Sequence, residues 1–234
     1  MTLRGCFQWL AVGLLTFFIG IPVILLGLLA CTRERKGRLF RRASKLYSGI
    51  ALWMLGVTVE GRGVSRVDPD KGYVFLSAHT SYLDPPVLTI VFPQPLFWVF
   101  KKELSKIPVF GWALLAMGQI MVDRSDAKQA RKSMGDAGKE LTGNMSVLVF
   151  PEGTRSKDGK LQPFKKGGFH LALGAGLPVV PVRIHGSHEL LPADALTVRS
   201  GHVVVELFDP IPTEGKTESD IPELMSQVRA ALLS

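Results

Sequence analysis

The sequence predicts an α/β domain with a mainly parallel central sheet flanked by helices, preceded by an N-terminal membrane-anchoring helical segment. After residue 58, short apolar runs alternate with longer segments of helical periodicity, which is typical of strands that helices connect into a parallel sheet. Before it, a long uncharged run is followed by a cationic block. The predicted division is a membrane anchor with a basic amphipathic helix at 1–58 and an α/β domain at 59–234.

The N-terminal run extends from Trp9 to Ala30, which is 22 residues without a charge. A helix of that length is about 33 Å long, enough to cross the hydrocarbon core of a bilayer. Pro22 lies inside the run, so a hairpin that re-enters one leaflet is an alternative. A cleaved signal peptide and a lipoprotein signal ending at Cys31 are two others. The length of the run and the cations after it favour a retained anchor.

Positive charge is concentrated directly after this run. The net charge is +8, and residues 32–45 carry seven cationic side chains against the single anion Glu34. The rest of the chain is close to neutral, which argues against nucleic acid as the main partner. A basic block beside an apolar segment instead favours an anionic membrane surface. Between 37 and 57 apolar residues recur at helical spacing with the cations off that stripe, which predicts a helix lying in the membrane interface.

The elements of the domain follow in order along the chain. Strands are predicted at 73–78, within 96–104, and at 119–123, 146–150 and 177–184. Helices are predicted at 108–118, at 126–144 with Asp126 as N-cap, at 167–176 and at 218–233. The stretch 85–92 is predicted as a helix or a short apolar segment, and 195–209 as a hairpin turning at Ser200-Gly201. The sequence EGRG at 60–63 is interpreted as a break.

Polar residues follow three of the predicted strands. His79 ends one, Arg124 ends another, and PEGTRS at 151–156 follows a third. Because ligands bind at the carboxyl ends of strands in such sheets, we expect these groups to converge. His79 and Asp84 are five residues apart, a spacing that brings two side chains together only in a turn. Pro85 favours a helix starting there, which makes Asp84 a natural N-cap after a four-residue turn.

By itself the pair of His79 and Asp84 has several interpretations. Asp84 could be only a helix cap and His79 a loop histidine. Metal binding is less favoured, because no third ligand lies at helical spacing and both cysteines, Cys6 and Cys31, precede the domain. A hydrolase with Ser81 as nucleophile would lack the G-x-S-x-G elbow.

The second cluster, at 149–159, favours an anionic ligand. Gly153 lets the backbone approach a ligand closely. Arg155 offers a planar guanidinium that matches phosphate geometry. Arg124 and Lys101 supply further positive charge near the predicted strand ends. Together with the histidine and aspartate, this cluster predicts an enzyme acting on a phosphate-bearing molecule.

With both clusters in view, the sequence resembles the 1-acyl-glycerol-3-phosphate acyltransferase family. The resemblance is carried by HTSYLD at 79–84, GQIMVDR at 118–124, FPEGTRS at 150–156 and LPVVPV at 177–182, and it covers about residues 50–210. Ala78 departs from the pattern, because many members carry asparagine there. The resemblance implies the glycerolipid acyltransferase fold.

The resemblance also implies roles for single residues. His79 would act as general base on the free hydroxyl of a lysophospholipid, Asp84 would orient its ring, and no covalent acyl-enzyme would form. The residues implied to hold the glycerol phosphate or to shape its pocket are Arg155, Arg124, Lys101, Glu152, Gly153 and Thr154.

The implied reaction acylates the sn-2 hydroxyl of 1-acyl-glycerol-3-phosphate and gives phosphatidic acid. Acyl-coenzyme A or acyl carrier protein would be the acyl-donor co-substrate, with no cofactor or metal. Glycerol-3-phosphate, another lysophospholipid or a lyso-ornithine lipid are alternative acceptors, and a membrane-bound lipid-binding protein is the non-enzyme alternative. The expected location is the inner membrane, with the active site facing the cytoplasm and membrane lipids as partners.

Overall fold

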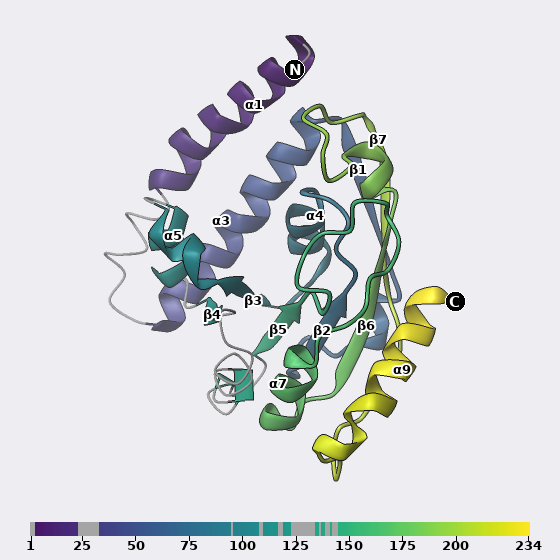
Figure 1. The fold of residues 1–234 in the computed structure, drawn as a ribbon. Coiled ribbons are helices and arrows are strands. Elements are labelled where there is room, and N and C mark those ends of the chain that lie inside the picture. Colours follow the sequence, from purple (N-terminus) through teal and green to yellow (C-terminus); the bar gives the residue numbers. More distant parts are fainter. Residues whose placement is uncertain are drawn as a thin grey trace.

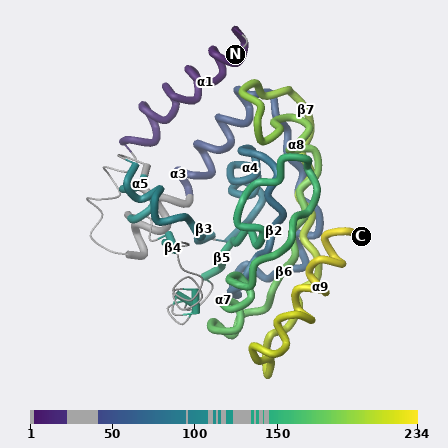
Figure 2. Tube along the Cα trace, viewed as in Figure 1, coloured from purple at the N-terminus to yellow at the C-terminus, as the bar shows by residue number. Residues whose placement is uncertain are grey.

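The computed structural model describes residues 3–22, 33–94, 96–107, 110–116, 119–122, 134–135, 137–138, 141 and 145–234. The described chain forms a central sheet with helices on both of its faces (Figure 1). The N-terminal helix α1 (Leu3–Leu15) lies on the side of α3 (Arg33–Met54), and the C-terminal helix α9 (Ile221–Leu233) lies across the sheet from them, as the tube in Figure 2 also shows. The predicted combination of an α/β domain with an apolar N-terminal helix is therefore confirmed.

Seven described strands form one sheet in the order β1-β7-β6-β2-β5-β3-β4. Their bounds are β1 Val57–Arg62, β2 Val74–Ser77, β3 Leu96–Lys101, β4 Ile120–Val122, β5 Ser146–Val149, β6 Val179–His185 and β7 Gly201–Leu207. Neighbouring strands are parallel except β6 and β7, which pair antiparallel. The sheet is thus mainly parallel, as predicted, and the carboxyl ends of β2, β3 and β5 meet at one edge.

The sheet separates two hydrophobic cores. On one face, Phe75 of β2 packs in a cluster with Leu88 of α4 (Asp84–Val91). On the other, Val74 and Leu76 pack in a cluster with Phe169 of α7 (Gly167–Ala175) and with apolar residues of α9. All five named side chains are fully buried, each worth roughly 1.5–3 kcal/mol. Burial on both faces explains why the central strands are continuously apolar rather than alternating.

Helix α3 covers the same face as α4 and is amphipathic, as the spacing predicts. It buries Ser48, Ala51 and Leu52 against the domain, while Leu46 and Trp53 are exposed at 58% and 79%. The shorter elements are α5 (Phe110–Ala116), α8 (Ser187–Leu190) and 3-10 turns at Val64–Arg66, Lys102–Lys106 and Glu218–Asp220.

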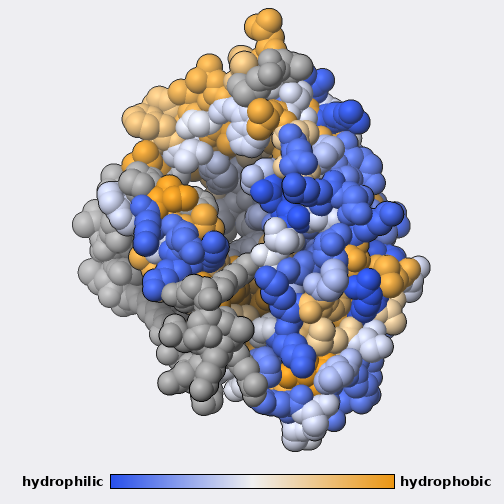
Figure 3. Space-filling view, viewed as in Figure 1, coloured by the Kyte–Doolittle hydropathy of each residue, from blue (hydrophilic) through white to orange (hydrophobic). Residues whose placement is uncertain are grey.

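Helix α1 continues through a π-helical turn at Thr16–Gly20. The stretch Leu3–Gly20 has a mean hydropathy of 1.4, and 11% of its residues are buried. Within the described residues it is the one helix long and apolar enough to cross a membrane. Figure 3 shows apolar side chains gathered along this helix on the surface. The predicted apolar run at 9–30 therefore begins inside a helix; its last eight residues, 23–30, lie outside the described residues.

Polar contacts hold α1 against the rest of the molecule. The amide of Gln8 both donates to and accepts from the backbone of Val198, at 3.0 and 3.1 Å. The indole of Trp9 donates to the carbonyl of Leu196 at 2.7 Å. Both partners belong to the loop before β7, so α1 packs along the domain instead of projecting away from it.

Two sequence predictions on this part of the fold are wrong. The stretch 195–209 is not a hairpin, because 195–200 is a loop and β7 pairs with β6 and β1 instead. The stretch 60–63, predicted as a break, lies in strand β1 as far as Arg62, where the strand ends. Gly61 misleads because it looks like a turn residue, yet a Cβ there would lie 2.9 Å from the side chain of Val91 on α4. A glycine is used here for close packing rather than for a turn.

The predicted helix at 126–144 lies mostly outside the described residues, and so does its proposed N-cap Asp126. Residues 134–135 and 137–138 are helical. The other predicted strands and helices of the domain are present with boundaries within about three residues.

Candidate active site

The turn between β2 and α4 brings His79 and Asp84 together. The Nδ1 atom of His79 lies 2.8 Å from Oδ2 of Asp84. The Asp84 side chain is fully buried, whereas the His79 side chain is 17% exposed. The ring therefore presents one nitrogen to the carboxylate and keeps access to the outside.

Asp84 is the first residue of α4, and the N-cap position belongs to Leu83. The carboxylate turns back onto the turn, where the backbone N–H groups of Thr80 and Ser81 donate to Oδ2 at 2.8 and 2.9 Å. The hydroxyl of Ser187 donates to Oδ1 at 2.6 Å. The predicted N-cap role is wrong, because the amides that Asp84 satisfies precede the helix. An ionised carboxylate, which only accepts hydrogen bonds, matches this set of donors.

The loop after β5 joins the same turn through Glu152. Its Oε1 accepts the backbone N–H of His79 at 2.7 Å, and its Oε2 accepts that of Gln162 at 2.8 Å. The backbone N–H of Ser156 donates to the carbonyl of His79 at 2.8 Å. Burial raises the pKa of the Glu152 carboxyl, against the two backbone N–H bonds, which lower it. Glu152 thus holds the two loops together and does not line the cavity described below.

The ring of His79 stacks on Phe150, with centroids 3.9 Å apart and 15° between the planes. The stack and the bond from Nδ1 to Asp84 fix the orientation of the ring. With Asp84 ionised, Nδ1 carries the ring proton and Nε2 has a free lone pair. No described residue bonds Nε2. The arrangement therefore offers an oriented base at a partly open site.

Arg155 belongs to the same loop as Glu152 and lines the same cavity as His79. Its guanidinium lies over the ring of Tyr82, with Cζ 3.3 Å from the ring centroid. Its Nη1 atom is buried and has no hydrogen-bond partner among the residues that the structure describes. A buried guanidinium nitrogen without a partner is costly, so this atom is suited to an anionic ligand. Gly153, two residues earlier, has a backbone φ of 76°, a value that residues with a side chain rarely adopt.

The other predicted cations have different positions. Lys101 ends β3, is exposed, and has its Nζ 3.3 Å from Oε1 of Glu103. It lines the same cavity as His79, as does Thr154. Arg124 lies outside the described residues. The structure thus brings His79, Asp84 and Arg155 together and leaves Lys101 at the edge.

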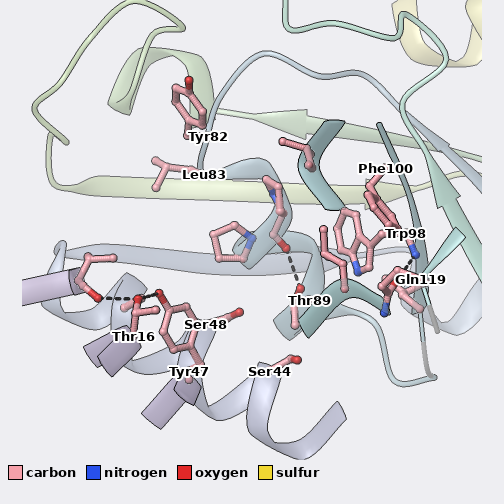
Figure 4. Close-up of a pocket in the computed structure, with 18 of the residues that line it drawn as sticks. Thr16, Ser44, Tyr47, Ser48, Tyr82, Leu83, Thr89, Trp98, Phe100 and Gln119 are labelled. Carbon is pink, nitrogen blue, oxygen red and sulfur yellow. Dashed lines mark hydrogen bonds between the residues drawn. The ribbon is translucent and has the colours of Figure 1, made fainter. Parts of the chain in front are cut away.

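A cavity of about 950 Å³ opens beside His79 and Arg155. Its walls come from α1, α3, α4, β3, the turn between β2 and α4, and the loop after β5. They are mostly apolar. Figure 4 shows the cavity between Tyr47 and Ser48 of α3 on one side and Trp98 and Phe100 of β3 on the other. Thr16 of the N-terminal segment bonds the hydroxyl of Tyr47 at 2.8 Å there. The cavity can hold a long apolar chain whose polar end reaches the histidine.

Two contributors to the site are not identified from the sequence. Tyr82 lies inside the motif HTSYLD, but nothing in the sequence shows that Arg155 stacks on it. Ser187 lies just after β6, at the carboxyl edge where the other site residues were expected. Applying the same strand-end reasoning to Gly186-Ser187 would have found it. Within the described residues, no group of three or more His, Cys, Asp or Glu side chains could hold a metal ion.

Comparison with known proteins places these features in a family. A family model described as Acyltransferase matches residues 57–185. The 1-acyl-sn-glycerol-3-phosphate acyltransferase alpha of Homo sapiens is 35% identical over 183 residues, covering 78% of this chain and 65% of that protein. The chain thus spans slightly less than two thirds of the human relative. The 1-acyl-sn-glycerol-3-phosphate acyltransferase of Limnanthes alba is 32% identical over 97% of this chain and 81% of its own length.

A solved structure has the same fold. The crystal structure of the 1-acyl-sn-glycerophosphate (LPA) acyltransferase, PlsC, from Thermotoga maritima superposes with a TM-score of 0.78 at 27% identity. The match covers 95% of this chain and 92% of that chain. It therefore includes the N-terminal helical segment as well as the sheet.

Proposed function

Because the chain belongs to the acyltransferase family, we propose that it moves a fatty acyl group from an acyl thioester to the sn-2 hydroxyl of 1-acyl-glycerol-3-phosphate, giving phosphatidic acid. Two relatives and a structural neighbour that are named for this activity support the reaction. The observation that carries the proposal is the His79 ring, held 2.8 Å from a buried carboxylate at the mouth of a large apolar cavity.

In the proposed reaction His79 acts as the general base. Nε2 removes the proton of the acceptor hydroxyl as its oxygen attacks the thioester carbon. The new C–O bond forms, the C–S bond breaks, and the proton passes from the imidazolium to the leaving thiolate. Asp84 stabilises the imidazolium and keeps Nδ1 protonated, so Nε2 is the reactive nitrogen. The substrate supplies the nucleophile, and no covalent acyl-enzyme forms.

The acceptor phosphate binds beside Arg155 in this proposal. The unpaired, buried Nη1 supports this position, since a phosphate oxygen would complete its hydrogen bonding. Lys101 at the cavity edge contributes long-range attraction rather than a fixed contact, and Arg124 stays a predicted source of positive charge. Gly153 and Thr154 form the wall, and Glu152 acts by holding the loop.

The acyl donor and the membrane set the orientation of the protein on the bilayer in this proposal. We propose that the apolar cavity holds the transferred chain and that the exposed face of α1 lies in the bilayer, at the cytoplasmic side of the inner membrane. The exposed apolar side chains of α1 support this, since contiguous apolar surface of this kind marks a membrane contact. The cations that follow favour the cytoplasmic leaflet. Acyl-coenzyme A and acyl carrier protein both fit a soluble donor reaching that face.

The first test is the His79→Ala variant of the full chain in detergent or vesicles. We expect acyl transfer to fall to background while the protein stays folded by circular dichroism and floats with vesicles, because the ring is at the rim and not in the core. Turnover is measured with 1-acyl-glycerol-3-phosphate and each of the two donors. Near-full turnover by the variant would show that His79 is not the base.

An acceptor panel separates the alternatives. Glycerol-3-phosphate, lysophosphatidylethanolamine and a lyso-ornithine lipid are compared with 1-acyl-glycerol-3-phosphate at equal donor concentration. Preference for a phosphate monoester agrees with the unpaired Nη1 of Arg155. Binding of all lipids without transfer to any of them would favour the non-enzyme alternative.

A further inference from the structure

The Asp84 carboxylate receives a hydrogen bond from a side chain in a distant part of the chain. The Ser187 hydroxyl donates to Oδ1 of Asp84 at 2.6 Å, across 103 residues of sequence. Both side chains are fully buried. Ser187 lies two residues beyond the segment that the family model matches, which ends at residue 185. Neither the motifs nor the family match assigns it a role.

The two carboxylate oxygens of Asp84 have unequal environments. Oδ2 accepts from the His79 ring and from the backbone N–H groups of Thr80 and Ser81. Among the described residues, Ser187 is the one donor to Oδ1. Without it Oδ1 would be a buried, charged oxygen with no partner, which costs more than the loss of a neutral hydrogen bond. The carboxylate could then rotate to share its donors, and Oδ2 would no longer face the ring in one fixed orientation.

Helix α8 is built to hold Ser187 in this position. Gly186 before it has φ of 87°, and a Cβ there would lie 2.5 Å from the carbonyl of His202 on β7. Only glycine allows β6 to turn directly into α8 at this point. At the other end of the helix, Ser81 donates its hydroxyl to the carbonyl of Leu191 at 2.8 Å. The turn that carries His79 and Asp84 is therefore hydrogen-bonded to both ends of α8.

We propose that Ser187 is a positioning residue for the acyl-transfer reaction, which fixes the Asp84 carboxylate so that its Oδ2 orients and polarises His79. Thr80 supports it, since its hydroxyl lies 3.3 Å from that of Ser187 and can donate to it. The other titratable groups around the pair are Glu152 on the His79 backbone, His188 at 3.4 Å from the Thr80 carbonyl, and Arg155 in the shared cavity. The inference rests on the proposed acyltransferase activity.

The test is Ser187→Ala, which removes one hydroxyl and keeps the packing. We expect kcat to fall about ten- to a hundredfold, the size of a lost hydrogen bond to a charged group, with KM for donor and acceptor within about twofold of wild type.

A matched control separates positioning from folding. Ser146 is an equally buried serine whose hydroxyl accepts one backbone N–H bond, from Tyr73 at 3.1 Å, at the opposite edge of the sheet. Ser146→Ala should also lower the melting temperature, by no more than Ser187→Ala because its bond is neutral, and should leave kcat unchanged. A nuclear magnetic resonance signal of the His79 Nδ1 proton, read without substrate, should shift in Ser187→Ala and not in Ser146→Ala.

The outcomes are distinct. Wild-type kcat in Ser187→Ala, or equal effects of the two variants on kcat and on the Nδ1 proton signal, would overturn the positioning role. If the wild-type protein transfers no acyl group to any acceptor, the proposed function fails instead. The Nδ1 proton signal would still report whether Ser187 sets the geometry of the pair.

Discussion

At the scale of single residues, Glu152 and Arg155 show how neighbouring members of one motif take different tasks. The Glu152 carboxylate is buried between two loops and accepts backbone N–H groups from each. Arg155 keeps a buried nitrogen unpaired beside the cavity. The two side chains have different directions in this loop: Glu152 faces the backbone N–H groups of the two loops, and Arg155 lies over the ring of Tyr82. The acidic residue therefore stabilises the site, and the cationic residue is available to a ligand.

The task of Arg155 can be tested by substitution. We expect Arg155→Ala to raise the acceptor KM about ten- to a hundredfold with a smaller change in donor KM, because a charged hydrogen bond to phosphate is lost. Arg155→Lys should give an intermediate KM, since an ammonium keeps the charge but loses the planar stack on Tyr82. Steady-state kinetics with varied acceptor measures both.

The control for this prediction is Arg62→Ala. Arg62 is exposed on the edge strand β1, where it pairs with Glu60 at 2.7 Å. The substitution removes one positive charge far from the cavity, so the acceptor KM should stay the same. An acceptor KM that is unchanged in Arg155→Ala would exclude Arg155 from the phosphate site.

At the scale of elements, α1 is held by hydrogen bonds that its apolar sequence does not suggest. The side chain of Gln8 is buried and pairs with both backbone groups of Val198. This contact fixes α1 across the loop before β7. Gln8, Trp9 and Val12 also line the cavity, so the position of α1 determines one of its walls.

Replacing Gln8 with leucine should loosen this wall. The variant keeps the size of the side chain but leaves the N–H and C=O of Val198 without partners, at roughly 1–3 kcal/mol. We expect the Val198 amide to exchange its hydrogen faster, and turnover with long-chain donors to fall more than turnover with short-chain ones. Hydrogen exchange followed by mass spectrometry reports the first effect.

A matched variant is Gln227→Leu on α9. Gln227 is exposed and bonds only Glu223 one turn earlier, at 3.0 Å. Exchange of Val198 and the chain-length profile should both be unaffected. If Gln8→Leu behaved like this control, α1 would be held by its apolar contacts alone.

At the scale of the whole molecule, the cavity depends on parts that lie far apart in sequence. Helices α1 and α3 form one wall, and the α/β domain forms the other. The site is therefore complete only when the N-terminal segment is docked. We expect a domain without that segment to have an open, solvent-filled groove instead of an apolar cavity.

Filling the cavity should change which acyl chains are used. Ser44 lines it from α3, so Ser44→Phe would occupy part of the volume. We expect kcat/KM for palmitoyl donors to fall relative to decanoyl donors, because a long chain loses room that a short one does not need. Competition between the two donors in one reaction measures the ratio directly.

Leu46→Phe serves as the control for this prediction. Leu46 is two residues along the same helix, 58% exposed, and does not line the cavity. The chain-length ratio should stay at the wild-type value there. An unchanged ratio in Ser44→Phe would mean that the transferred chain lies elsewhere.

The sequence alone determined the fold class, most of the element order and the two motif clusters. This is because apolar periodicity and strand-end polar residues are local features: VFLS predicts a buried strand wherever it packs, and Pro85 starts a helix without help from the rest of the chain. The same local reasoning failed at Gly61 and at 195–209. There the outcome depends on Val91 and on the strands β6 and β1, none of which is nearby in sequence.

Only the tertiary structure decided which groups meet. It placed Ser187 against Asp84 across 103 residues, laid Arg155 over Tyr82, and closed the cavity with α1. Such contacts come from the way helices pack on the sheet, and many packings are compatible with the same local pattern. The chemistry of His79 follows from its neighbours in sequence, whereas the orientation of its ring depends on side chains that reach it through the fold.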